Sequence, residues 1–299
     1  MLRTAQETIA GALNFDTKIV CPLCGRTGSH TKHVLARSEI RRCAQCGFVF
    51  AYGAPPDTAE EGYYESMGGY EQFLAAKKPE WRALFRDLAR RTKGRKLLEV
   101  GCARGYALAT ARETGWLPRG VELSIDDTVF ARQKFGLDVY HGTVESCPFE
   151  EDSFDVIIMW SVIEHIADSG SALRACRRLL KPGGLLSIHT CNVDSIVAWE
   201  TRRNWTMYHM PGHVSFFSPA TMRNALDKTG FEIVMLKTAL GAKPVDVDPE
   251  KRCKPSLRRA LAGVAAGLRL KEPLREAIYM FRPYLRDHGE FMAVVARKT

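Results

Sequence analysis

Four of the nine cysteines occur as two Cys-x-x-Cys pairs, the strongest chemical signal in the sequence. The pairs are Cys21 with Cys24 in CPLCG and Cys43 with Cys46 in CAQCG, and 18 residues separate them. Zn²⁺ in structural sites takes four soft ligands in a closed tetrahedral shell, which thiolates at this spacing supply. A closed shell has no position for a substrate. We therefore predict a structural zinc that folds a small N-terminal domain with too little core of its own.

A glycine-rich stretch at residues 96–108, KLLEVGCARGYAL, has the form of a strand, a tight turn and a helix. Gly101 allows a sharp turn, and Gly105 would let a ligand approach the start of the helix. The spacing Gly101-x-Ala103-x-Gly105 lacks the third glycine of a dinucleotide fingerprint, and no Gly-Lys-Ser/Thr follows, which excludes a P-loop. Glu122 ends the next strand pattern about 20 residues later, where an acid accepts hydrogen bonds from a ribose. Together they predict a nucleotide-type site, although the loop alone also fits a plain strand–turn–helix unit.

Three histidines, His165, His209 and His213, are candidates for proton transfer. Histidine suits a general base at neutral pH because its ordinary pKa lies near 6.5. His165 follows the apolar segment SFDVIIMWS, whereas the other two lie in the aromatic stretch NWTMYHMPGHVSFFSP. Each is equally compatible with a buried histidine that has only a structural role.

Strand and helix patterns alternate from residue 96 onward. The strand-like runs are KLLEV, LPRGVEL, DVYHG, FDVIIMW, LLSIHT, FEIVMLKTAL and FMAVVAR, and helical segments separate most of them. Apolar strands separated by helices indicate a parallel sheet that is covered on both faces. We predict an α/β fold with a Rossmann-like, doubly wound, seven-stranded and mostly parallel sheet, preceded by the four-cysteine zinc ribbon.

The predicted organisation has three parts. Residues 1–55 form a short N-terminal helix and the zinc ribbon, and residues 56–95 form a linker and a helical lead-in. Residues 96–299 form the main domain, in which a basic helical insert at 241–289 interrupts the last pair of strands. Asp168 or Ser169 is expected to begin one helix of this domain, and Ser218 another.

Much of the net charge of +9 lies in one segment. Residues 251–287 hold ten lysines or arginines and only three acids. Such a segment can contact an anionic membrane surface or phosphates, or it can pack its apolar stripe against the fold. The sequence has no apolar run that could span a bilayer and no signal-peptide core. We expect a cytoplasmic protein, with peripheral contact at the inner membrane surface through residues 251–287 as one option.

Several short motifs occur together and in order. They are Glu99 with the glycine loop, Glu122, Phe154-Asp155, Glu164-His165 and Lys181-Pro182-Gly183-Gly184. In this order they resemble the class I S-adenosylmethionine-dependent methyltransferases. The resemblance covers roughly residues 80–240 and the last strand. It implies that the chain is an enzyme and that S-adenosylmethionine is its cofactor.

The resemblance also implies a role for each matching position. Glu99 and the loop would hold the methionine part of the cofactor, Glu122 the ribose, and the residues after the third strand the adenine. Thr143 stands where many relatives carry an acid. Trp160 and Ser161 leave the fourth strand and would line the methyl-transfer cavity. The cofactor-binding residues expected on this basis are Glu99, Gly101, Ala103, Gly105, Glu122, Thr143, Val144, Trp160 and Ser161.

A second resemblance indicates which kind of molecule accepts the methyl group. The run PxHxxFFSP around His213, with CGFVFAYGAP and the pair Tyr63-Tyr64, resembles a bacterial subgroup tied to cell-surface polysaccharide, lipid or secondary-metabolite pathways. It favours O-methylation of a small molecule, a glycan or a lipid-linked sugar, with His213 at the acceptor pocket. Three alternatives stay open: an RNA methyltransferase that uses the ribbon and the basic insert, a sugar C-methyltransferase, and a non-catalytic cofactor-binding scaffold. RNA is disfavoured because WSVIEH replaces the Asn/Asp-Pro-Pro-Tyr/Phe signature and the ribbon lacks an aromatic and basic stacking surface.

Overall fold

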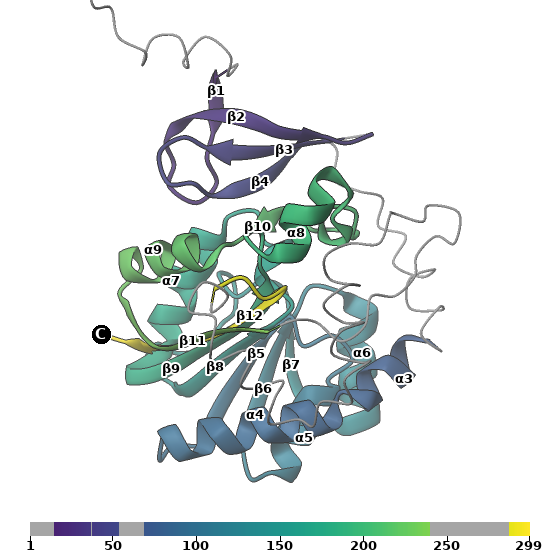
Figure 1. The fold of residues 1–299 in the computed structure, drawn as a ribbon. Helices are drawn as coiled ribbons and strands as arrows, with labels where there is room; N and C mark the ends of the chain where they lie inside the picture. The colour runs from purple at the N-terminus through teal and green to yellow at the C-terminus, as the bar shows by residue number, and fades with distance from the viewer. Residues whose placement is uncertain (1–14, 37, 54–68, 240–286) are drawn as a thin grey trace, which may run out of the picture.

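The computed structural model describes residues 15–36, 38–53, 69–239 and 287–299. Its centre is a seven-stranded sheet with four parallel and two antiparallel strand pairs (Figure 1). The prediction of a Rossmann-like, mostly parallel seven-stranded sheet is confirmed. The strands, in spatial order, are β11 (Phe231–Ala239), β12 (Phe291–Lys298), β9 (Leu180–Cys191), β8 (Phe154–Trp160), β5 (Lys96–Val100), β6 (Leu117–Glu122) and β7 (Asp138–His141).

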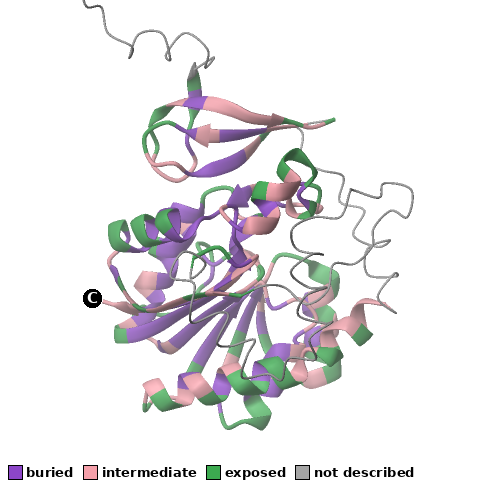
Figure 2. Ribbon diagram, in the orientation of Figure 1, coloured by how far each residue is buried: buried purple, intermediate pink, exposed green. Residues whose placement is uncertain are grey.

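Helices cover both faces of this sheet, as the doubly wound prediction requires. On one face lie α4 (Lys78–Arg91), α5 (Tyr106–Glu113) and α6 (Ile125–Phe135), whose apolar side chains share one core with the strands. On the other lie α7 (Ser169–Leu179) and α9 (Pro219–Lys228), which share a second core. The central strands β5, β8 and β9 are mostly buried between them (Figure 2).

Local side-chain chemistry accounts for the positions of these elements. Leu97 faces one core and Leu98 the other, because successive residues of a strand point to opposite faces. Asp168 caps the N-terminus of α7, because its Oδ1 accepts a hydrogen bond from Ser171 N at 2.9 Å. Helix α9 begins at a capping box centred on Ser218. Both expected helix starts are therefore observed.

The cysteine-bearing segment forms a second, antiparallel sheet. Its strands are β1 (Phe15–Val20), β2 (Thr27–Val34), β3 (Ser38–Cys43) and β4 (Val49–Gly53). The fifth strand comes from the main domain: β10 (Ser215–Phe216) pairs antiparallel with β4. The ribbon therefore lies against the main domain on the side of β10 and α8 (Ile196–Thr201) (Figure 1).

Apolar packing joins the two sheets. Phe48 of the ribbon packs on Phe217 with ring centroids 4.8 Å apart, and both are fully buried. A separate cluster combines Ile40 and Val49 of the ribbon with residues that include Trp205, Tyr208 and Phe216 of the main domain. Because the ribbon shares buried apolar contacts with the main domain, the two are packed together and not merely joined by a linker.

Several short elements were not predicted from the sequence, and two predicted segments lie outside the described residues. Helix α3 (Tyr70–Ala76) lies within the expected linker, and β9 begins at Leu180, so the Lys-Pro-Gly-Gly turn belongs to the strand. Three short 3₁₀ turns are η1 (Ile163–His165), η2 (Arg202–Asn204) and η3 (Thr206–Tyr208). The helix expected at 1–14 and nearly all of the 241–289 insert lie outside the described residues. In the part of the chain that is described, no helix has the length and apolar content needed to cross a membrane.

Candidate functional site

The loop between β5 and α5 has a left-handed backbone at three positions. The φ angles are +67° at Gly101, +45° at Ala103 and +77° at Gly105. A Cβ on Gly101 would lie only 2.6 Å from Val162 Cγ2, so the segment that follows β8 requires glycine there. Ala103, the expected departure from the glycine pattern, is tolerated in a conformation that alanine rarely adopts.

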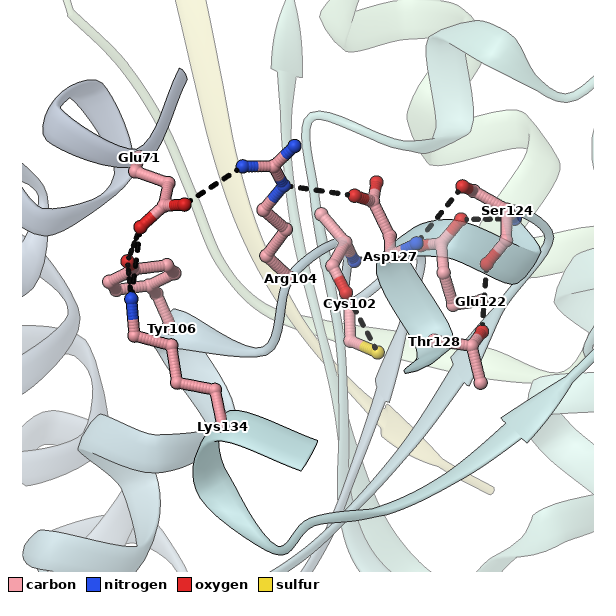
Figure 3. Close-up of polar contacts among 10 residues, drawn as sticks. Glu71, Cys102, Arg104, Tyr106, Glu122, Ser124, Asp127, Thr128 and Lys134 are labelled. Carbon is pink, nitrogen blue, oxygen red and sulfur yellow. Dashed lines mark hydrogen bonds and ion pairs between the residues drawn. The ribbon is translucent and has the colours of Figure 1, made fainter. Parts of the chain in front are cut away.

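Glu122, the last residue of β6, holds this loop with one carboxylate oxygen and the turn before α6 with the other (Figure 3). Its Oε2 accepts a hydrogen bond from Ala103 N at 2.8 Å, and its Oε1 accepts one from Ser124 N at 2.8 Å. Each oxygen retains a lone pair for a further donor, such as a ribose hydroxyl. The bond to Glu122 also explains how the backbone at Ala103 is held in its strained conformation.

Glu99 lies buried beneath the loop. It is 4% exposed, and its Oε2 has no hydrogen-bond partner among the described residues. Burial raises the pKa of this carboxyl well above its ordinary value, and the nearby Glu122 raises it further. An unpaired carboxyl in such a place is unfavourable unless a ligand supplies a donor or a positive charge. The two acids at adjacent strand ends therefore favour a cationic ligand that also carries hydroxyl groups.

Gly105 makes room for neighbouring protein atoms. A Cβ at this position would lie 2.7 Å from Leu137 Cδ1 and 2.9 Å from Ala131 Cβ. Ala131 belongs to α6, so the close approach is that of a helix to the start of α5. Packing within the protein is therefore one reason for glycine here, and the approach of a ligand at Gly105 stays a prediction.

Replacing Gly105 with alanine is expected to lower the free energy of unfolding by about 2–4 kcal/mol, from overpacking and backbone strain together. Urea denaturation would measure the loss. The matched control is Gly115→Ala, which also has a positive φ of +87° but whose Cβ would meet nothing within 4 Å. Its expected cost is about 1 kcal/mol. Equal losses in the two variants would contradict the packing role.

A belt of polar side chains anchors α3 beside the loop (Figure 3). Glu71 accepts hydrogen bonds from Arg104 Nη1 at 3.1 Å, Tyr106 Oη at 2.8 Å and Lys134 Nζ at 2.9 Å. The bonds from Lys134 and Tyr106 lower the pKa of Glu71. Arg104 also reaches Asp127 Oδ1 with its Nε at 3.2 Å. No sequence motif pointed to this belt, because its members come from three helices and the glycine loop, which only the fold brings together.

The residues expected at the adenine lie in the turn after β7. Val144 is buried, and Thr143 is exposed with its backbone N donating to Ser146 Oγ at 3.2 Å. Gly142 N donates to the carbonyl oxygen of Glu122 at 2.9 Å. The turn is therefore attached to the same residue that holds the glycine loop.

Trp160 and Ser161, expected at the methyl-transfer cavity, lie at the end of β8. Trp160 stacks on His189 with ring centroids 4.6 Å apart, and the backbone N of Ser161 donates to the His189 carbonyl at 2.9 Å. Burial lowers the pKa of His189 to about 4. Trp160 lines a cavity of about 160 Å³ together with Leu84 of α4 and Ala293 of β12. The cavity lies on the α4 face of the sheet, at the carboxyl end of β8.

Two of the three candidate histidines lie together after β8. The rings of His165 and His213 are perpendicular, with centroids 4.7 Å apart. His213 is 6% exposed, and burial together with His165 lowers its pKa to about 3. The neutral imidazole is thus a weak proton acceptor whose lone pair stays available. His209 lies apart from this pair: it is exposed, and its Nε2 lies 2.9 Å from the Arg203 carbonyl oxygen.

Glu164 completes this pair of histidines, although the sequence singled it out only as part of a motif. Its side chain is buried, and Thr190 Oγ1 donates a hydrogen bond to its Oε2 at 2.9 Å. Burial raises the pKa of Glu164 to about 7. Its backbone carbonyl also accepts a hydrogen bond from Val214 N at 2.9 Å, which fastens η1 to the chain just after His213.

The four ribbon cysteines converge as their spacing predicts. Cys21 Sγ lies 3.7 Å from Cys46 Sγ, and Cys24 Sγ lies 3.7 Å from Cys43 Sγ. Four sulfurs around a tetrahedral Zn²⁺ with bonds near 2.3 Å lie roughly 3.8 Å apart. The hydrogen bond between Cys21 and Cys46 lowers the pKa of the Cys46 thiol and raises that of Cys21, so Cys46 carries the negative charge of this pair. All four sulfur atoms lie within 4.8 Å of one another, so the arrangement fits a tetrahedral metal ion.

Residues 72–236 match the family described as "Methyltransferase domain". This match covers more than half of the chain, and the chain therefore belongs to that family. With its Rossmann-like sheet, it is a member of the class I S-adenosylmethionine-dependent methyltransferases.

The curated relatives align with about half of this chain. It is 27% identical over 151 residues to a Mycolicibacterium smegmatis protein named "Probable S-adenosylmethionine-dependent methyltransferase", covering 50% of this chain and 57% of the relative. It is 31% identical over 153 residues to the ubiquinone biosynthesis O-methyltransferase of Roseobacter denitrificans, covering 48% and 62%. The match thus spans less than two thirds of each relative.

Solved structures show the same fold at low identity. A SAM-dependent methyltransferase from Archaeoglobus fulgidus is similar with a TM-score of 0.54 and 19% identity, covering 79% of this chain and 98% of that one. A Haloferax volcanii complex of the Trm112 methyltransferase activator with a methyltransferase gives a TM-score of 0.54 at 18% identity, covering 82% and 97%. These likenesses support the fold alone.

Proposed function

We propose that the chain transfers a methyl group from S-adenosylmethionine to a hydroxyl of a small molecule, a glycan or a lipid-linked sugar. The observation that carries the proposal is the pair of acids, Glu99 and Glu122, on either side of the loop that begins at Gly101. S-Adenosylmethionine supplies an activated methyl group when it is bound. The protein's part is to bind, orient and exclude water.

The loop residues fit this cofactor by their chemistry. Glu99 offers a buried carboxyl oxygen without a partner in the described residues, which suits the ammonium group of the methionine part. Glu122 presents two oxygens that are already oriented by backbone N–H groups and can accept from the ribose hydroxyls. Val144 and its turn would border the adenine. We further propose that the four ribbon cysteines hold a structural zinc ion.

Two observations support oxygen as the atom that is methylated. Among the curated relatives are several ubiquinone biosynthesis O-methyltransferases, which act on oxygen by their names. The His165–His213 pair lies just after β8, on the same sheet edge as the glycine loop. A neutral imidazole there can accept a hydrogen bond from an acceptor hydroxyl and orient it towards the methyl group.

The proposal is tested by incubating the purified chain with methyl-labelled S-adenosylmethionine and an extract of cells that express it. The label is then separated into RNA, organic-soluble lipid and aqueous small-molecule fractions. Label in the lipid or small-molecule fraction supports the proposal. Label in RNA would replace it with an RNA methyltransferase, and label bound to carbon rather than oxygen would favour a sugar C-methyltransferase.

Substitution of His213 separates acceptor chemistry from cofactor binding. His213→Ala is expected to lower kcat by about ten- to a hundredfold and to change the Kd for S-adenosylmethionine by less than about twofold. Labelled turnover and calorimetric titration would measure the two quantities. His209→Ala tests the other candidate of this segment, and a much smaller effect is expected because its imidazole lies apart. Unchanged turnover in His213→Ala would remove this histidine from the reaction.

A further inference from the structure

Three potential metal ligands meet at the end of β8, outside the loop that holds the cofactor. Glu164, His165 and His213 each present one ligand atom, and these atoms lie within 4.8 Å of one another. Two of the three residues are buried: Glu164 is 3% exposed and His213 is 6% exposed. His165 keeps an exposed edge, so the cluster is accessible from one side.

One nitrogen of this cluster lacks a hydrogen-bond partner although it is buried. His213 Nδ1 is a buried nitrogen without a hydrogen-bond partner in the described part of the chain. Glu164 accepts its side-chain hydrogen bond from Thr190, on Oε2 at 2.9 Å. In the part of the chain that the structure describes, the carboxyl makes no hydrogen bond to either imidazole. Because buried polar atoms are nearly always satisfied, an unpaired nitrogen beside a carboxyl indicates a missing partner.

We propose that Glu164, His165 and His213 bind a divalent first-row transition-metal ion. Two imidazoles and one carboxylate are a donor set that suits Zn²⁺ and Fe²⁺, whereas Mg²⁺ and Ca²⁺ prefer oxygen ligands alone. Bonds of about 2.0–2.2 Å would draw the ligand atoms together by on the order of 1 Å from their present spacing. Thr190 orients the carboxylate in the way that outer partners orient ligands in metal sites.

Three protein ligands leave at least one coordination position open. An acceptor hydroxyl that occupies this position would lose its proton more readily, since a bound cation stabilises the resulting oxygen anion. The ion would then replace the weak base His213 as the group that activates the acceptor. This role rests on the proposed O-methyltransferase function, whereas metal binding itself does not.

Cobalt binding by the full-length chain tests the site. The protein is purified with its ribbon zinc, dialysed against Co²⁺, washed, and analysed for both metals by mass spectrometry and visible absorption. We expect about one Co²⁺ per chain beyond the ribbon zinc, with d–d bands of a site that lacks thiolate ligands. His165→Ala and Glu164→Gln are expected to lose this cobalt and to keep the zinc.

His165→Ala is the most informative variant because the ring has an exposed edge and its removal leaves the core intact. The matched control is His209→Ala, an exposed histidine from the same region, which should retain the cobalt. Wild-type protein without bound Co²⁺, or cobalt retained in both ligand variants, would overturn the proposal. The result is independent of the methylation assay: cobalt binding without methyl transfer would refute only the proposed function.

Discussion

Replacing Cys43 with serine is expected to unfold the ribbon sheet and to abolish methyl transfer. The variant loses one of four thiolates in a closed shell, and structural zinc contributes about 10–16 kcal/mol to folding in isolated zinc modules. The loss reaches the main domain, since β4 pairs with β10 through Phe50–Ser215 and Val49–Phe216. His213 lies only two residues before β10, so the acceptor side of the site should lose its geometry with the ribbon.

Zinc content, thermal unfolding and labelled turnover would measure this outcome. The variant should contain no ribbon zinc, and its melting midpoint should fall by more than about 10 °C. The control is Cys176→Ala, a buried cysteine of α7 outside the zinc cluster. It should keep its zinc and cost about 1 kcal/mol from a small cavity. Full turnover in a zinc-free Cys43 variant would contradict the coupling between the ribbon and the site.

Replacing Glu99 with glutamine is expected to have opposite effects on stability and on cofactor binding. The buried carboxyl has a raised pKa, so the folded chain holds this proton to a higher pH than the unfolded chain. Unfolding therefore releases a proton, and the contribution of Glu99 to stability falls as pH rises above its ordinary value of 4.5. Glutamine removes the ionisable group and should stabilise the cofactor-free protein at neutral pH by about 1–3 kcal/mol.

The same substitution should weaken the binding of S-adenosylmethionine by about tenfold or more, because the cationic end of the ligand loses a charged acceptor. Urea denaturation between acidic and neutral pH would show a flatter pH dependence for Glu99→Gln than for the wild type. Glu150→Gln, at an exposed position, is the control and should follow the wild type. A destabilised Glu99→Gln variant at neutral pH would mean that the carboxylate is satisfied in the free protein.

Local patterns predicted most of the fold and the four-cysteine cluster, whereas the roles assigned to the cofactor and acceptor residues stay predictions. The apolar run of β8 and the glycines around β5 are short-range signals, so the main sheet, the loop and the cysteine cluster followed from them. The pairing of β10 with β4 did not, because a two-residue strand has no pattern of its own. The proximity of Glu164 to His213 was not predicted for a related reason. The two residues are separated by 48 others along the chain, and only the folded structure brings their side chains together.

The role of single residues was harder to predict than their position. Gly105 lies at the start of α5 as the glycine spacing predicts, and the close packing of α6 there is a further reason for glycine that no local spacing encodes. The position of His213 at the acceptor pocket stays a prediction, and its low pKa follows from burial that only the assembled core creates.

The pairing of β4 with β10 also has a consequence for the order in which the chain folds during synthesis. The ribbon strands leave the ribosome early, but the partner of β4 emerges only after residue 216. Until then β4 presents an unpaired edge and the apolar side chains of Phe48 and Val49, features that promote association between chains. Early zinc capture would leave this edge open. The nascent ribbon therefore depends on late docking, and shortened versions that end before β10 should aggregate rather than yield a soluble zinc module.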